Sequence, residues 1–256
     1  MHSRFSLHPA LPWLLPAAIL AVWQISASAG LLSGRILPAP TAVASAAGHL
    51  IATGELWGHL AASFRRAAAG FAVGGAVGFG LGLLTGASRV AARFLDSTIQ
   101  MVRNIPHLAL IPLVIIWFGV GEAGKLFLVS LGVMFPIYIN TFHGMRSVDA
   151  GLIEMGRVYG LSRWKIFKYI MLPGAMSSIL VGVRFALGFM WLTLIVAETI
   201  AADSGIGKMA MDAREFMQTD IVVVAILLYA LLGKLADVAA SLLERRWLDW
   251  NQEGQS

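Results

Sequence analysis

The chain has 256 residues, of which 58% are hydrophobic and only 13% are charged, and its formal net charge is +5. Long charge-free runs separate the charges, which is the composition of a protein embedded in a lipid bilayer rather than of a soluble domain. The basic residues gather at the ends of the apolar runs, as in membrane proteins, so nucleic acid is not expected as a partner. The sequence contains no cysteine, which excludes disulfide and thiol chemistry.

Six stretches approach the roughly 20 apolar residues that a helix needs to cross a bilayer. Four carry no charge, namely residues 5–34, 67–88, 104–121 and 126–145. Two more, residues 175–201 and 217–243, are spans only if they tolerate charges inside or near their ends, namely Arg184, Glu198, Lys234 and Asp237. The expected fold class is therefore an all-α integral membrane protein with about six transmembrane helices in one membrane domain.

The first stretch has two interpretations. Arg4, the apolar run and the small-residue sequence SASAG at 26–30 are also typical of a cleavable signal peptide. Pro12 and Pro16 fit poorly into a short, uniform signal core, so a retained helix is favoured. Removing this stretch would leave every later loop on the same side of the membrane.

The second stretch contains a glycine repeat. An amphipathic helix is expected to begin at Glu55 and to enter the membrane near Ala67. Glycine then recurs every fourth residue, at Gly70, Gly74, Gly78, Gly82 and Gly86. This spacing places small residues along one helical stripe and predicts close packing against a neighbouring helix. A phosphate-binding loop is disfavoured, because the segment is long, apolar and helix-spaced.

The sequence GVGEAGKL, residues 119–126, nearly matches a nucleotide-binding P-loop. Leu126 occupies the position of the Mg²⁺-binding hydroxyl, and no suitable acidic strand end follows. We therefore expect a tight turn between two helices. The six histidines show no metal-binding spacing, and the sequence contains no nucleophile elbow, so an enzyme is not expected.

The cationic residues predict the orientation of the chain. With the N-terminus inside, the connections near 88–98 and 144–174 and the end after 243 face the cytoplasm. Thirteen cationic residues then lie on the inner side, namely Arg4, Arg89, Arg93, Arg103, Arg146, Arg157, Arg163, Lys165, Lys168, Arg184, Lys234, Arg245 and Arg246. Six lie outside, namely Arg35, Arg65, Arg66, Lys125, Lys208 and Arg214. The excess favours this orientation under the positive-inside rule.

The longest polar passage, residues 154–173, lies between the fourth and fifth expected spans. Its spacing reproduces the EAA signature, E-A-A-x3-G-x9-I-x-L-P, at Glu154, Met155, Gly156, Gly160, Ile170, Leu172 and Pro173. Met155 and Gly156 replace the two alanines. The passage, in which Leu161 and Ser162 follow Gly160, resembles the cytoplasmic coupling loop of ABC importer permeases. Residues 55–250 resemble the nitrate, sulfonate and taurine branch, and aliphatic sulfonate permeases most closely.

The resemblance implies a type I ABC importer permease fold in the bacterial inner membrane. Residues 1–54 would be an N-terminal transmembrane helix with an external connection, 55–250 the permease core with its EAA loop at 144–173, and 251–256 a cytoplasmic tail. The implied partners are a second permease copy, two ATP-binding subunits and a periplasmic or lipoprotein substrate-binding protein. The chain would bind no cofactor and catalyse no reaction, since ATP and Mg²⁺ would bind to the ATPase.

The residues of this loop are compatible with two short helices. Gly160 permits a left-handed turn, the sequence SRWKIF begins a second helix, and Pro173 is expected to end it and start the next span. In the family, these two short helices sit in a groove of the ATPase subunit, and they transmit closure of the ATPase dimer to the membrane helices. The alternative is an ordinary solvated loop.

Charged and aromatic residues within the spans are candidates for the substrate pathway. Around the start of the third span these are Arg103, Asn104, Pro106 and His107, and farther along the chain they are Trp117, Arg184, Trp191 and Glu198. Arg184 and Glu198 are expected near one face of a helix. The alternatives are that Arg103 and Arg184 reach the cytoplasmic headgroups, that Glu198 reaches the outer interface, and that both tryptophans serve packing or anchoring. Lys234 and Asp237 are expected to form an intrahelical pair.

Two questions stay open at the level of sequence. The substrate is an aliphatic sulfonate by resemblance, with taurine, nitrate or a small heterocycle as alternatives. A secondary transporter that needs no ATPase is a different class, and it would be favoured by inverted repeats with broken helices or by an intramembrane carboxylate relay.

Overall fold

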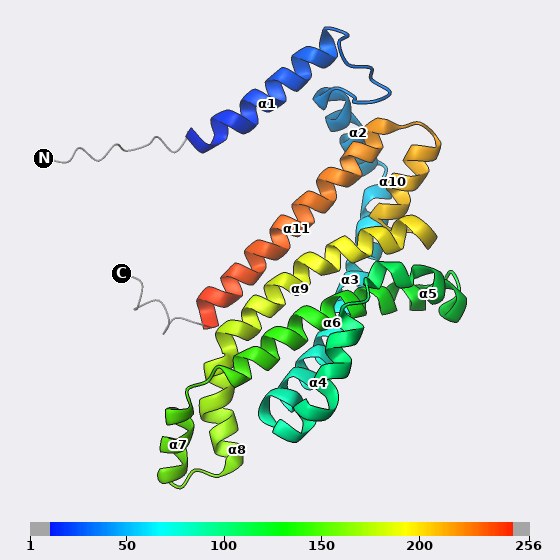
Figure 1. The fold of residues 1–256 in the computed structure, drawn as a ribbon. Helices are drawn as coiled ribbons and strands as arrows, with labels where there is room; N and C mark the ends of the chain where they lie inside the picture. The colour runs from blue at the N-terminus through cyan, green and yellow to red at the C-terminus, as the bar shows by residue number, and fades with distance from the viewer. Residues whose placement is uncertain (1–10, 248–256) are drawn as a thin grey trace, which may run out of the picture.

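The computed structural model describes residues 11–247, and within that range the chain is helical and contains no strand (Figure 1). The helices are α1 (Leu11–Ser28), α2 (Pro40–Ala52), α3 (Glu55–Ala87), α4 (Arg89–Arg103), the 3₁₀-helix η1 (His107–Leu110), α5 (Ile111–Phe118), α6 (Glu122–Arg146), α7 (Ala150–Val158), α8 (Arg163–Ile166), the π-helix η2 (Phe167–Met171), α9 (Leu172–Ala201), α10 (Ile206–Glu215) and α11 (Thr219–Trp247). The expected tail at 251–256 and the first residues of the first expected span lie outside the described residues.

Four continuous helices in the described range are long and apolar enough to cross a membrane. They are α3, α6, the run from α8 through α9 (Arg163–Ile200), and α11. The apolar helix within the first expected span is shorter, at Trp13–Ser28. These helices confirm the all-helical class and the second, fourth, fifth and sixth expected spans.

The third expected span, residues 104–121, is helical only at His107–Phe118. Arg89–Arg103 and His107–Phe118 form a pair of helices bent by 79°. Pro106, which precedes η1, has an extended backbone with ψ 109°, and its ring disfavours a helical conformation at residue 105. The connection expected at 88–98 is also helical, because Ser88 caps α4 by accepting a hydrogen bond from the N–H of Ala91 (3.2 Å).

The glycine stripe lies where α3 and α6 pack against each other in parallel. Gly70, in the middle of α3, faces Val129 in the first half of α6, and Gly86 faces Met145 near the ends of both helices. A side chain at Gly74 would overlap the backbone of α6. The prediction of close helix packing is therefore confirmed.

Helix α9 runs antiparallel to α6. It packs on a different face of α6 from the one that meets the glycine stripe of α3. Gly144 of α6 lies against Ala175 and Ser178, and Gly132 lies against Thr193. The bundle thus has one end at the start of α6, the Glu122 end, and another at its finish, the Arg146 end (Figure 1). Helices α7 and α8 lie at the Arg146 end, and α2 and α10 lie at the Glu122 end.

The expectation that Pro173 ends a helix is wrong. Helices α8, η2 and α9 follow one another without a break, and Pro173 lies in the first turn of α9. Proline within a helix loses one hydrogen bond and its ring meets the carbonyl four residues earlier. The π-helical turn η2 widens the helix at that position and accommodates the ring.

Candidate functional site

The polar passage between α6 and α9 forms a hairpin of two short helices. Asp149 caps α7 by accepting a hydrogen bond from the N–H of Gly151 (2.7 Å), and Ser162 caps α8 by accepting one from the N–H of Lys165 (3.3 Å). The expectation of two short helices is confirmed. We call residues 149–171 the α7–α8 hairpin.

Gly160 makes the turn between these helices. Its φ is +74°, its N–H donates to the carbonyl of Arg157 (3.0 Å), and the N–H of Leu161 donates to the carbonyl of Gly156 (2.9 Å). These two hydrogen bonds form a Schellman motif, in which glycine is preferred at the left-handed position. The left-handed turn predicted at Gly160 is therefore present.

Gly156 lies in the contact between the two arms of the hairpin. It is buried, and a β-carbon at this position would lie 2.7 Å from Ile170 Cδ1 and 3.4 Å from Ile166 Cγ1. A small residue is therefore required for α7 to pack on the start of the long helix. Leu172, partly buried, packs beside Met145 and Ala175 at the base of the hairpin.

The outer face of the hairpin presents apolar side chains to solvent. Val158 is 86% exposed, Tyr159 is 79% exposed, and Met155 and Trp164 are also exposed. Glu154 lies on the exposed face of α7. A contiguous exposed surface of this kind is typical of a protein-binding site.

A separate pocket of about 310 Å³ lies at the bend between α4 and α5. Its lining contains Arg103, His107, Gly132, Phe135, Pro136, Ile139, Asn140, Phe185 and Phe189. His107 Nε2 lies 3.0 Å from Thr193 Oγ1, which fixes the ring against α9. The structure thus brings two of the predicted pathway residues, Arg103 and His107, into one cavity.

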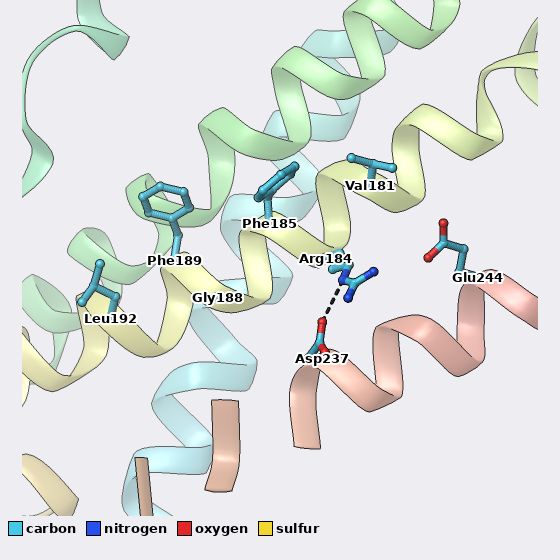
Figure 2. Close-up of a pocket in the computed structure, with 8 residues that line it drawn as sticks. All are labelled: Val181, Arg184, Phe185, Gly188, Phe189, Leu192, Asp237 and Glu244. Atoms are coloured by element: carbon cyan, nitrogen blue, oxygen red, sulfur yellow. Dashed lines mark hydrogen bonds and ion pairs between the residues drawn. The ribbon is translucent and has the colours of Figure 1, made fainter. Parts of the chain in front are cut away.

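The structure places Arg184 apart from this pocket. Arg184 Nε donates to Asp237 Oδ1 of α11 (2.7 Å), in a groove of about 570 Å³ between α9 and α11. Figure 2 shows this pair, with Phe185 and Phe189 pointing away from α11. Asp237 also forms the expected intrahelical pair with Lys234, at 3.5 Å.

The remaining predicted pathway residues are dispersed. Trp117 is 60% exposed on α5, whereas Trp191 is buried and its ring meets Tyr229 edge-on, with 6.5 Å between centroids. Asn104 follows the last turn of α4 and Pro106 precedes η1. Trp191 therefore lies in the hydrophobic core of the bundle.

Glu198 does not join Arg184, although both belong to α9. Its carboxylate is 1% exposed and accepts four hydrogen bonds, from Ser63 Oγ (2.8 Å), Arg66 Nη1 (2.8 Å), Gly207 N (3.0 Å) and Tyr229 Oη (3.0 Å). The alternative that Glu198 reaches the outer interface is therefore wrong. Its partners come from α3, α10 and α11.

Arg66 connects this carboxylate to α6. Its Nε and Nη2 each lie 2.7 Å from an oxygen of Glu122, and it also donates to the carbonyl of Ser204. Lys125 Nζ contacts the same Glu122 at 3.1 Å. Arg66 and Lys125, which the sequence analysis assigned to the outer connections, are both buried.

The sequence contains a signal for this network that the sequence analysis missed. Ser63 and Arg66 are three residues apart, as are Glu122 and Lys125, so each pair lies on one face of its helix. Both helices lead into the glycine contact. The turn predicted for GVGEAGKL is confirmed, because α5 ends at Phe118 and α6 begins at Glu122.

One exposed ion pair lies on α10, outside the spans. Lys208 Nζ donates to Asp212 Oδ1, one helical turn away. This hydrogen bond raises the pKa of Lys208.

Comparison with known proteins identifies the family to which this helical arrangement belongs. Residues 78–249 match the family described as binding-protein-dependent transport system inner membrane component. The chain belongs to this family. It is 65% identical over 240 residues to the aliphatic sulfonates transport permease SsuC of Escherichia coli, covering 94% of this chain and 91% of that one.

Two further comparisons place the chain among transport permeases. It is 36% identical to the taurine transport permease TauC of Escherichia coli, over 93% of this chain and 89% of that one. A chain of the inward-facing MetNI methionine ABC transporter matches with a TM-score of 0.56 and 20% identity, covering 75% of this chain and 93% of that one. The fold is that of a type I importer permease, and the chain is a non-catalytic subunit of the inner membrane.

Proposed function

We propose that this chain is the permease subunit that carries aliphatic sulfonates across the inner membrane in a binding-protein-dependent ABC importer. The observation that carries the substrate class is the 65% identity to SsuC across 94% of the chain, against 36% to TauC. A neutral heterocycle, nitrate and taurine are the competing substrates.

In this proposal the α7–α8 hairpin receives force from the ATPase. Its exposed apolar face, with Val158 and Tyr159 at the turn, offers a protein-docking surface. Its packed base continues directly into α9, because the helix from residue 163 to 200 is unbroken. A displacement of the hairpin would therefore move the whole helix from residue 163 to 200.

The proposed assembly contains two copies of this chain, two ATP-binding subunits that hold ATP and Mg²⁺, and a soluble or lipid-anchored binding protein. Large apolar side chains are exposed along the described length of α11 and α9, among them Leu231, Leu235, Leu192 and Ile200. Such surfaces need lipid or another protein against them. ATP binding would close the ATPases and open the outer side of the pathway, and hydrolysis would reset it.

Uptake of labelled ethanesulfonate and taurine into proteoliposomes with the cognate ATPase and binding protein tests this function. Wild type is expected to take up ethanesulfonate only with ATP. Gly160→Val is expected to lose uptake, since φ +74° strongly disfavours a β-branched residue and the hairpin turn would shift. Gly58→Val is a control at a helical glycine with open space around it.

The outcomes separate the parts of the proposal. Uptake that persists without the ATPase would contradict an importer, and it would favour a secondary transporter. ATP hydrolysis stimulated by the binding protein, without sulfonate uptake, would retain the importer and reject the substrate.

A further inference from the structure

The pocket at the α4–α5 bend lies at the middle of the bundle. Its α6 residues extend from Gly132 to Asn140, and α6 itself runs from Glu122 to Arg146. At 1.5 Å per residue, Gly132 lies about 15 Å from the first residue of α6 and Asn140 about 9 Å from the last. The pocket therefore lies level with the middle third of α6, and Arg103 is exposed at its rim.

The backbone is irregular on two walls of this pocket. The helix is interrupted between Arg103 and His107, and Pro136 removes one hydrogen bond from α6 on the opposite wall. Irregular backbone at membrane depth is tolerated where it is covered by protein or lines a water-filled cavity. These interruptions are compatible with a cavity that holds water or a ligand.

Arg103 brings a positive charge to this cavity without a protein partner. Among residues 11–247 it makes no ion pair and no hydrogen bond through its guanidinium, in contrast to Arg66 and Arg184. Arg103 is exposed, so its guanidinium is open to water or to an anion. Arg103 therefore favours an anionic ligand.

Neighbouring polar groups complete the polar part of the pocket. His107 is held at Nε2 by Thr193, which leaves Nδ1 free of hydrogen bonds within the described chain. Gly132 makes this arrangement possible, because a β-carbon there would lie 2.7 Å from Thr193 Oγ1 and 3.5 Å from His107 Nε2. Asn140 uses one amide hydrogen on the Pro136 carbonyl (2.9 Å) and retains a second.

The rest of the lining is apolar. Phe135, Ile139, Phe185 and Phe189 supply it, and the His107 and Phe189 rings meet edge-on with 6.5 Å between centroids. A volume of about 310 Å³ lies at the lower limit of typical ligand sites. The pocket thus offers a small polar region beside an aromatic wall.

We propose that this pocket is a transient binding site for small amphipathic anions, in which Arg103, His107 and Asn140 contact the sulfonate group and Phe185 and Phe189 contact the alkyl chain. The proposal rests on the proposed sulfonate transport and adds a site within the membrane that selects the substrate. Three donors around one anion stabilise it by charge-assisted hydrogen bonds. A single exposed arginine limits the strength of binding and permits release.

This arrangement has a consequence for selectivity. Nitrate has no alkyl chain to contact the phenylalanines. Taurine would place an ammonium group against an apolar wall without a carboxylate among the lining residues. The site therefore favours alkanesulfonates over both competitors.

The test uses the complete transporter, with its ATPase and binding protein, in proteoliposomes. Arg103→Gln removes the cation and is compared with Arg93→Gln, an exposed arginine on the same helix and outside the pocket lining. Arg103→Gln is expected to lower ethanesulfonate uptake roughly 10- to 100-fold. Hydrolysis of ATP stimulated by the binding protein is expected to continue, since the hairpin is untouched. Equal uptake by the two variants would overturn the site.

A second variant keeps the test decisive if Arg103→Gln fails to assemble. Phe189→Ala shortens the aromatic wall, and it is expected to lower uptake of butanesulfonate more than uptake of methanesulfonate. If the ratio of butanesulfonate uptake to methanesulfonate uptake equals that of wild type, this would overturn the site while leaving the proposed function intact. Absence of sulfonate uptake by wild type would instead reject the proposed function and this site with it.

Discussion

A single carboxylate, that of Glu198, connects several helices at the Glu122 end of the bundle. Its four donors come from α3, α10 and α11, and Arg66 extends the network to Glu122 on α6. A buried ion costs several kcal/mol to desolvate unless it is paired and hydrogen-bonded. The complete set of donors around Glu198 explains how a charge at 1% exposure is tolerated.

Loss of Arg66 is therefore expected to be strongly destabilising. Arg66→Met should lower the free energy of unfolding by about 3–5 kcal/mol, because it leaves the Glu198 charge without its cation. Arg65→Met, at the exposed neighbouring position, should change this free energy by less than about 0.5 kcal/mol. Tryptophan fluorescence during detergent-induced unfolding in mixed micelles measures the free energy of unfolding of both variants. Similar values for the two variants would contradict the role of Arg66.

The residues of this network illustrate what one sequence can predict. Glu198 was identified as a candidate because a carboxylate in an apolar run is unusual. Its partner Arg66 is 132 positions away, and nothing in the local pattern of either segment specifies the pairing. The local features of the α7–α8 hairpin were predictable, because the turn at Gly160 depends on residues within one short segment.

At the scale of helices, the contact between α3 and α6 depends on residues that have no side chain. Gly74→Ala would place a methyl group against the carbonyl oxygen of Ser130, so it should lower the free energy of unfolding by about 1–3 kcal/mol. Gly80→Ala is the matched control on the same helix, with no atom within 4 Å of the added carbon. Because alanine favours helices, Gly80→Ala should be neutral or stabilising. The same unfolding measurement checks this, and a larger loss of unfolding free energy in Gly80→Ala than in Gly74→Ala would contradict the packing role of the glycine stripe.

The helices also show where prediction from apolar length fails. Residues 104–121 contain enough apolar side chains for a span, but the helix begins only after Pro106 and ends before Gly119, and a hydropathy count registers neither residue. Helix α4 was mistaken for a connection because it is charged. Its charges lie on an amphipathic helix, with Gln100 donating to Asp96 one turn away. The glycine repeat was interpreted correctly, since its spacing depends only on helix geometry.

For the whole molecule, the parallel packing of α3 and α6 imposes a condition on the topology. Both helices run from the Glu122 end to the Arg146 end, so the chain between them must return across the bundle. The bent pair α4 and η1–α5 makes this return. It therefore acts as a span with its break beside the pocket of Arg103 and His107.

The orientation of the whole chain can be tested with single cysteines, because the sequence contains none of its own. Tyr159→Cys places a thiol on the α7–α8 hairpin and Gln218→Cys places one near the Glu122 end, both at exposed positions. The excess of cationic residues on the hairpin side predicts that this side faces the cytoplasm. A membrane-impermeant maleimide should then label Gln218→Cys in intact spheroplasts and Tyr159→Cys only after permeabilisation. The reverse pattern would place the hairpin outside, where it could not meet an ATPase, and would contradict the orientation and the coupling role together.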